Sequence, residues 1–222
     1  MSAWWTYAPG DLLLFSERTY YRMFELHNAA LWPAQVVALA LALAVALLMA
    51  SGWGHRVRAV GAVIAACWLF VAWTFLLGRY AAINWVAPWF AALFIVEAAL
   101  FAAVAVAGRP GALGGRWGPA QVVVFAAAVL AQPAAGLLAG RPWRQAEIFG
   151  LAPDPTAIAT LGLLAVAPRG SRWLLLPLPV LWCAVSGATL WTMGAPDAWL
   201  APTAAAFAMV APPLLRGRTA GV

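Results

Sequence analysis

Residues 31–52 have the sequence LWPAQVVALALALAVALLMASG, and this stretch decides the fold. Between Ala34 and Ala50, Gln35 is the only polar side chain. A helix rises about 1.5 Å per residue, so about 20 apolar residues cross the hydrocarbon core of a bilayer. The stretch therefore predicts a membrane-spanning helix, with Pro33 at a position tolerated at the start of a helix.

The composition of the whole chain agrees with this local pattern. Hydrophobic residues make up 65% of the 222 residues, charged residues make up 9%, and the mean hydropathy is +0.88. About a quarter of the residues of a soluble domain are charged. The composition excludes a soluble globular protein, a disordered protein and a nucleic-acid-binding module. The expected surroundings are a lipid bilayer, and nucleic acid is not an expected partner.

Six further apolar segments follow the first, which predicts an all-α integral membrane bundle with seven transmembrane helices in a single domain, residues 1–222. The fifth segment is too short to span a membrane unless it extends back through Pro153, Asp154 and Pro155, so we expect a broken or interfacial helix there. The seven segments are residues 31–52, 59–77, 85–106, 119–138, 155–167, 173–193 and 199–215.

The orientation of the bundle follows from its arginines, because all 13 basic residues are Arg and they lie in the connections between apolar segments. Cytoplasmic connections of membrane proteins are enriched in basic residues. The larger set therefore predicts a cytoplasmic C-terminus and a periplasmic N-terminus. The larger set is Arg56, Arg58, Arg109, Arg116, Arg169, Arg172, Arg216 and Arg218, and the other set is Arg18, Arg22, Arg79, Arg141 and Arg144.

Residues 11–28 differ from the apolar segments, because they form an amphipathic pattern. At helical spacing, one face is apolar and the opposite face carries charged and polar residues, with Leu14 and Tyr21 as exceptions. This pattern predicts an N-terminal interfacial helix that lies in the outer membrane surface, with Asp11 as its cap. The apolar face is formed by Leu12, Phe15, Tyr20, Met23, Phe24 and Leu26, with His27 beside them.

A short internal repeat connects the first and fourth segments. The residues 33–37, PAQVV, recur as residues 119–123. Three spans in each unit would make the two units inverted relative to each other, an arrangement found in many transporters. We therefore consider a 3+3 inverted repeat with one additional span. A chance match in a chain rich in Ala and Val is the alternative.

Glu97 is the charged residue nearest the middle of a clear span. Phe90, Phe94 and Phe101 share its helical face, so we expect Glu97 to point into the bundle. A buried acid requires a partner, and Gln132, which precedes Pro133 in the fourth segment, is the expected one. The position suits either a proton- or cation-coupled site or a neutral acid hydrogen-bonded within the bundle.

No cofactor or metal is expected. Cys67 and Cys183 each lie within an apolar segment without a CxxC or His/Cys spacing. His27 and His55 fall on opposite sides of the predicted membrane, which excludes a bis-His haem. The absence of Lys from the sequence excludes a retinal Schiff base.

Several short motifs carry a resemblance to a known family. They are AWWTY (residues 3–7), DLLLFS (11–16), RTY (18–20), FEL (24–26), WPAQ (32–35), YAAINW (80–85) and FGLAPDPT (149–156). Through them the chain resembles a family of uncharacterised bacterial multi-spanning membrane proteins. The resemblance implies a protein of the bacterial inner membrane. It implies no activity.

These observations favour the binding or passage of a small solute or ion through the bundle. The predicted site runs from an outer vestibule, formed by Asn84, Asp154 and His27, to Glu97 and Gln132. An enzymatic role is less favoured. One alternative is a membrane-embedded enzyme acting on a lipid or isoprenoid, which would use Asp154, Glu147 and Arg144. Another is a structural subunit without its own site. Each of these roles is compatible with a homo-oligomer or a larger membrane complex.

Overall fold

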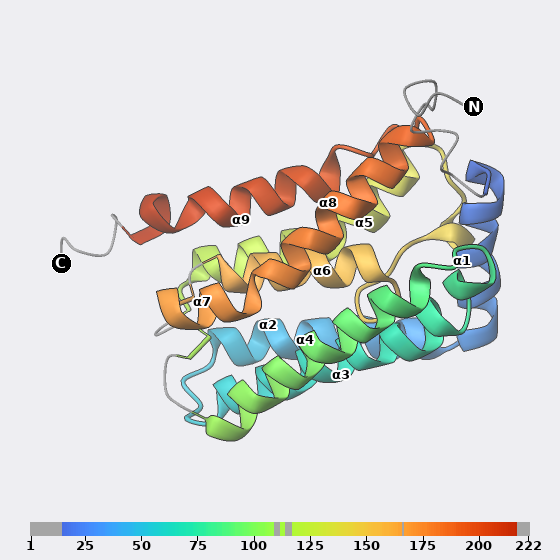
Figure 1. The fold of residues 1–222 in the computed structure, drawn as a ribbon. Coiled ribbons are helices and arrows are strands. Elements are labelled where there is room, and N and C mark those ends of the chain that lie inside the picture. Colours follow the sequence, from blue (N-terminus) through green and yellow to red (C-terminus); the bar gives the residue numbers. More distant parts are fainter. Residues whose placement is uncertain (1–14, 109–111, 114–116, 166, 217–222) are drawn as a thin grey trace, which may run out of the picture.

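The computed structural model describes residues 15–108, 112–113, 117–165 and 167–216. Within these ranges the chain is helical, with no strand. Figure 1 shows α1 lying across one end of a bundle of helices that run between its two ends. The elements are α1 (Glu17–Leu31), α2 (Ala34–Ala50), α3 (Arg56–Val71), η3 (Ala72–Leu77), η4 (Tyr80–Ala82), α4 (Ala87–Ala107), α5 (Pro119–Leu138), η5 (Trp143–Gln145), α6 (Pro153–Leu164), α7 (Arg169–Leu175), α8 (Pro177–Thr192) and α9 (Leu200–Arg216).

Each of the seven predicted segments contains helix, but the helices differ in their ability to cross a membrane. Among the described residues, three are long and apolar enough: Arg56–Ala82, α4 and α5. Two bent pairs, α1 with α2 and α7 with α8, raise the number to five if each pair is one span. The all-α membrane-type fold is therefore confirmed at the level of three to five candidate spans, and the seven-span count stays a prediction.

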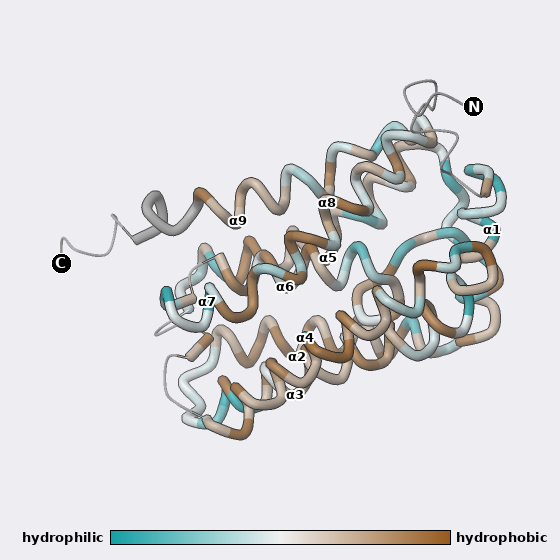
Figure 2. Tube along the Cα trace, in the orientation of Figure 1, coloured by the Kyte–Doolittle hydropathy of each residue, from teal (hydrophilic) through white to brown (hydrophobic). Residues whose placement is uncertain are grey.

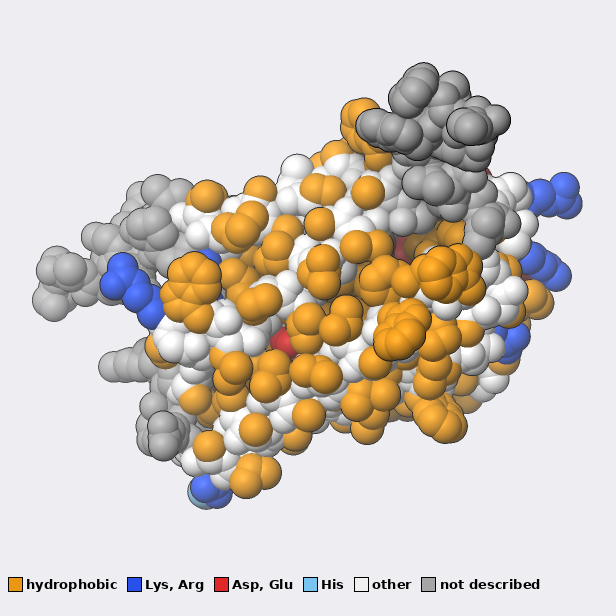
Figure 3. All heavy atoms as spheres, viewed as in Figure 1, with side chains coloured by type: hydrophobic (Ala, Val, Ile, Leu, Met, Phe, Trp, Pro, Cys, Tyr) orange, Lys and Arg blue, Asp and Glu red, His pale blue; other side chains and the backbone are white. Residues whose placement is uncertain are grey.

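The surface of α4 and α5 is compatible with a membrane protein. In the most apolar 18-residue window of each helix, only 28% and 22% of the residues are buried within the protein. Figure 2 shows hydrophobic residues along most of the bundle helices. On the face drawn in the space-filling view, hydrophobic side chains predominate across the middle, with an acidic atom visible at one point, and the basic side chains lie towards the two ends (Figure 3). Such an apolar surface is unfavourable in water and matches a lipid environment.

The predicted amphipathic helix corresponds to α1, which makes an angle of 90° with α2. Ser16 caps its N-terminus, because its Oγ accepts a hydrogen bond from the Thr19 amide. Asp11, the expected cap, lies outside the described residues. Tyr20, Met23, Phe24 and His27 are buried as the predicted face requires, but two neighbours differ from the prediction. Tyr21 is buried beneath a side chain from another loop, and Leu26 is 45% exposed.

The fifth predicted segment forms α6, a short helix at the centre of the bundle. All of its described residues are buried, and it packs against α3, α5, α8 and α9. Gly162 permits the close approach to α5, since an added Cβ would lie 3.1 Å from the Cβ of Ala128. Pro153 starts the helix, and the non-helical residues 146–152 that precede it lie largely within the protein. The segment is thus a short buried helix interrupted before Pro153, which does not fit the interfacial alternative.

The two copies of the PAQVV repeat make different contacts. The Gln35 side chain donates from Nε2 to the carbonyl oxygen of Asn28, at 2.7 Å. The Gln121 side chain instead accepts at Oε1 from the amide of Gly118, which caps α5. The inverted repeat therefore stays a prediction.

Candidate functional site

The connection between α5 and α6, residues 139–152, folds back beneath α1. Gly140, with φ of +79°, permits the reversal after α5, because its conformation is strained for residues with a side chain. Asn28 then fixes the loop by donating from Nδ2 to the carbonyl oxygens of Arg144 and Ala146, both at 2.9 Å. His27 donates from Nε2 to the carbonyl oxygen of Leu151 at 3.1 Å. His27 and Asn28, in the last part of α1, therefore position this loop against the bundle.

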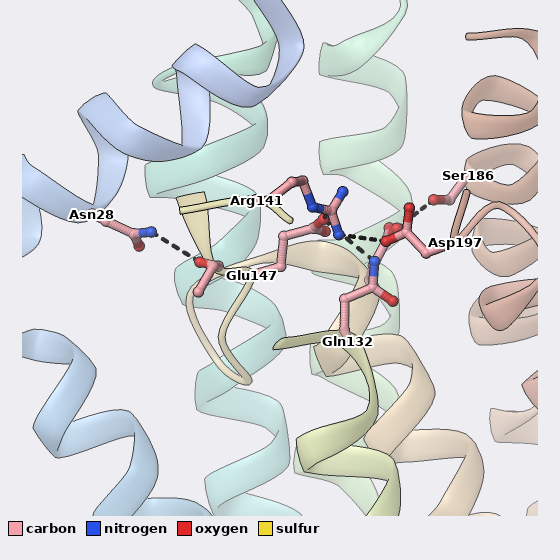
Figure 4. Close-up of polar contacts among 8 residues, drawn as sticks. Asn28, Gln132, Arg141, Glu147, Ser186 and Asp197 are labelled. Atoms are coloured by element: carbon pink, nitrogen blue, oxygen red, sulfur yellow. Dashed lines mark hydrogen bonds and ion pairs between the residues drawn. The ribbon is translucent and has the colours of Figure 1, made fainter. Parts of the chain in front are cut away.

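Arg141 lies at the centre of a buried polar cluster (Figure 4). Its Nη2 forms an ion pair and hydrogen bond with Oδ2 of Asp197, in the turn between α8 and α9. Its Nη1 lies 3.9 Å from Oε1 of Glu147. The guanidinium carbon lies 4.3 Å from the centre of the Tyr21 ring, at cation–π distance. The Arg141 side chain thus links α1, the 139–152 loop and the α8–α9 turn.

Two further helices, α5 and α6, contribute side chains to this cluster. Gln132, on α5, donates from Nε2 to Oε1 of Glu147 at 3.3 Å. Asp154, in the first turn of α6, accepts from Nε1 of Trp182 at 2.7 Å and from Oγ of Ser186 at 2.5 Å. Glu147, Asp154 and Asp197 are all at most 3% exposed. Asp197 and Glu147 flank the guanidinium of Arg141, and Asp154 is close enough to interact with it electrostatically.

The charge balance of the cluster determines its protonation. Burial raises the pKa of Glu147 well above its ordinary value, and the nearby Asp154 carboxyl raises it further. Arg141 opposes this shift but is also close to Asp197. Three ionised carboxylates and one guanidinium would leave two uncompensated negative charges in a buried site, which is unfavourable. We therefore expect Glu147 to hold a proton at neutral pH.

The cluster also contains unused hydrogen-bonding capacity. Among the described residues, five of its buried polar atoms have no hydrogen-bond partner. Buried polar groups are normally paired, so these unpaired atoms offer hydrogen-bonding sites to water or to a small polar ligand. These atoms are the Tyr21 hydroxyl oxygen, Gln132 Oε1, Arg141 Nη1, Glu147 Oε2 and Asp197 Oδ1.

The structure brings together only part of the predicted site. Gln132 and Asp154 belong to the cluster, and His27 holds the loop that carries Glu147. Asn84 instead accepts at Oδ1 from the amide of Val86 at 3.0 Å, at the turn before α4. The three residues proposed for a lipid- or isoprenoid-modifying enzyme differ in their exposure: Glu147 and Asp154 are buried, whereas Arg144 is exposed.

Glu97 is fully buried on α4, as its aromatic neighbours predicted. The predicted hydrogen bond to Gln132 is wrong, because among the described residues neither carboxyl oxygen of Glu97 has a partner. Gln132 instead donates to Glu147, which lies in the 139–152 loop. Helical spacing does not predict the position of a loop residue.

Sequence reasoning missed Tyr21, Arg141 and Asp197 as members of the cluster. In the sequence, Arg141 indicates only membrane orientation, and Tyr21 is an exception on an amphipathic helix. The one signal in the sequence is the scarcity of charge, because charged residues are only 9% of the chain and an acid buried outside α1 therefore needs a partner. Within the described ranges, no group of three or more His, Cys, Asp or Glu residues is arranged to hold a metal ion.

Comparison with known proteins gives one match. A family model described as a family of unknown function (DUF6064) matches residues 17–219. No curated protein and no solved structure matches the chain.

Proposed function

Because the chain belongs to DUF6064, a family of unknown function, we propose a function from the geometry of the polar cluster. The protein takes up a small cation, in the first place a proton, at Glu147 and its neighbours. This uptake accompanies the passage of a small solute or ion through the bundle. The observation that carries the proposal is the gathering of three buried carboxyl groups around one guanidinium, which Asp197 and Glu147 flank and with which Asp154 interacts electrostatically. Such coupled carboxyl groups exchange protons as a unit.

A proton is favoured over a divalent metal ion by the arrangement of the ligands. The described residues offer no cluster of three or more metal-ligating side chains. Two of the carboxyl groups already accept hydrogen bonds from neutral donors, Asp154 from Ser186 and Glu147 from Gln132. Proton uptake removes the excess negative charge without displacing these donors.

An aromatic contact extends from the cluster towards Glu97. Trp182, which donates to Asp154, has its ring centre 5.1 Å from that of Phe94. Phe94 and Glu97 are three residues apart on α4 and are both buried. In our proposal, Glu97 is the next protonatable group along the bundle. Asp154 lies in the first turn of α6, where the positive end of the helix dipole favours a negative charge.

We place this activity in the bacterial inner membrane. The proposed topology has seven spans, α1 in the outer interface, a periplasmic N-terminus and a cytoplasmic C-terminus. The two broken or bent segments, α6 and α7–α8, would then accompany longer neighbours across the bilayer. The 3+3 inverted repeat remains part of this proposal and is supported by the position of the two PAQVV copies at helix starts.

Proton flux in liposomes tests the proposal. The purified protein is reconstituted with an internal pH-sensitive dye, and a potassium gradient with valinomycin drives proton entry. We expect Glu147→Gln and Glu97→Gln to abolish flux above that of empty liposomes while the proteins keep the melting temperature of the wild type or exceed it. Glu17→Gln, on the exposed side of α1, serves as the matched control and should keep the wild-type rate. Equal rates for all four proteins would contradict the proposal and would favour a structural subunit.

A further inference from the structure

A surface cavity lies at the same end of the bundle as the polar cluster, between α1, the start of α2 and η5. It has a volume of about 460 Å³. Trp32 and Trp143 border it, and their side chains are 67% and 69% exposed. Exposed indoles in membrane proteins concentrate at the level of the lipid headgroups. The cavity therefore opens at headgroup depth, with α1 along one wall.

An unsatisfied acceptor lines this cavity. Gln35 is 9% exposed and uses its Nε2 to donate to the carbonyl oxygen of Asn28. Its Oε1 is buried and, among the described residues, accepts no hydrogen bond. A buried amide oxygen without a partner is costly, so the position suits a ligand that brings an N–H or O–H donor.

Two residues of opposite charge line the same cavity. Arg144 lines it on the η5 side, and Asn28 fixes the backbone at this position through the Arg144 carbonyl oxygen. Glu25 lines it on the α1 side and forms a 2.7 Å ion pair with Arg22. A ligand that fits this arrangement carries a negative group for Arg144 and a hydrogen-bond-donating positive group for Glu25 and Gln35.

An apolar track leads away from the cavity along α2. Val36, Leu39 and Leu43 are spaced by three and four residues, so they share one face of α2, and Trp32 lies in the turn that precedes the helix. Their side chains are between 48% and 67% exposed. An acyl chain attached to the ligand can lie along this face within the hydrocarbon core.

We propose that the cavity binds a phospholipid with a primary ammonium headgroup, of the phosphatidylethanolamine class. The phosphate pairs with Arg144, and the ammonium donates to Gln35 Oε1 and to the Glu25 carboxylate. Phosphatidylcholine fits less well, because its methylated ammonium has no N–H to donate. An anionic headgroup such as that of phosphatidylglycerol fits less well too, because it brings no positive charge for the Glu25 carboxylate. This site is separate from the buried acidic cluster and does not depend on proton uptake.

Native mass spectrometry of the detergent-purified protein tests the proposal. Dissociation constants are measured for phosphatidylethanolamine, phosphatidylcholine and phosphatidylglycerol with identical acyl chains, and for phosphorylethanolamine without acyl chains. We expect the wild type to bind phosphatidylethanolamine about tenfold more tightly than either other lipid, as one additional charged hydrogen bond implies. Phosphorylethanolamine should bind more weakly than the intact lipid, because it cannot use the apolar track.

Three variants assign the contacts. Arg144→Gln should weaken the binding of phosphatidylethanolamine and phosphatidylcholine to a similar extent, because both carry the phosphate. Glu25→Gln and Gln35→Met should weaken only phosphatidylethanolamine. Glu25 is partly exposed and tests the ammonium contact even if Gln35→Met fails to fold. Arg18→Gln, outside the cavity, is the control and should bind as the wild type does.

The outcomes that overturn the proposal are distinct. Equal affinity for phosphatidylethanolamine and phosphatidylcholine removes the ammonium contact. Stronger binding of phosphatidylglycerol assigns the cavity to anionic lipids, and equal binding of phosphorylethanolamine assigns it to a soluble solute. Lipid binding that is unchanged in all three variants places the lipid elsewhere.

Discussion

Arg141 and Asp197 form a buried ion pair across 56 residues of sequence, joining the loop after α5 to the turn before α9. Arg141→Met removes the positive charge and leaves Asp197 buried without its partner. Loss of one member of a buried ion pair costs about 3–5 kcal/mol. We expect a clear decrease in melting temperature in detergent, whereas the exposed Arg144→Met should melt as the wild type does. Equal melting of the two variants would show that the ion pair contributes nothing to stability.

His27 should make the protein sensitive to acid. Burial lowers the pKa of His27 to about 4, whereas an unfolded His has a pKa of about 6.5. Protonation thus favours the unfolded state, and the stabilising contribution of neutral His27 is present above pH 6.5 and lost as the pH falls towards 4. The loss amounts to about 3 kcal/mol.

Melting temperatures between pH 7 and pH 4.5 check this assignment. Glu147 opposes His27, because its raised pKa makes the folded state bind protons more tightly than the unfolded state above pH 4.5. The informative quantity is therefore the difference between wild type and His27→Gln, which should shift in favour of the variant as the pH falls. The exposed His55→Gln should keep the wild-type profile. A constant difference for His27→Gln would contradict the prediction.

Gly162 should be intolerant of a larger side chain. An added Cβ would lie 3.1 Å from the Ala128 Cβ and 3.4 Å from the Val124 carbonyl oxygen, so α5 and α6 would have to separate. Overpacking of this kind costs about 1–3 kcal/mol. Gly170→Ala is the control, because nothing lies within 4 Å of its added Cβ. Thermal unfolding should show a loss for Gly162→Ala and none for Gly170→Ala, and the reverse order would disprove the close packing.

Thr160 supplies the acceptor for a buried indole. Nε1 of Trp68 donates to Thr160 Oγ1 at 2.9 Å, and the Thr160 hydroxyl donates to the Thr156 carbonyl oxygen. Thr160→Val keeps the shape but leaves the indole N–H buried without a partner, at a cost of about 1–3 kcal/mol. Thr192→Val removes only a bond within α8 and should cost less. The melting temperatures of the two variants compare these costs directly.

Cysteine labelling tests the proposed orientation. Cys67 and Cys183 are buried and should react little with a membrane-impermeant maleimide. In intact cells, R144C at the outer end should be labelled. R169C, at the opposite end, should react only after the membrane is permeabilised. The opposite pattern would reverse the topology, and labelling of both in intact cells would place α6–α7 differently.

The sequence could predict what depends on local spacing. Apolar runs identified the helices, the Phe residues around Glu97 predicted its burial, and prolines at 153 and 155 marked the broken helix. The pairing of Glu97 with Gln132 failed because helical periodicity gives the face of a residue but not its partner in space. The partners of Arg141 come from α1 and from the turn before α9. Contacts between such distant segments depend on how the helices pack, which no local pattern encodes.

The complete burial of α6 has a consequence for how the protein is made. Helices that insert one by one into a bilayer need an apolar surface towards lipid before they associate. The twelve residues of α6 include Asp154, Thr156 and Thr160, so this helix would be unstable in direct contact with lipid. Its neighbours α8 and α9 are synthesised after it, so α6 becomes enclosed only when the C-terminal part of the chain arrives. We therefore expect the enclosure of α6 to be completed only from the C-terminal end, so that a chain truncated before α9 leaves the polar residues of its central helix uncovered.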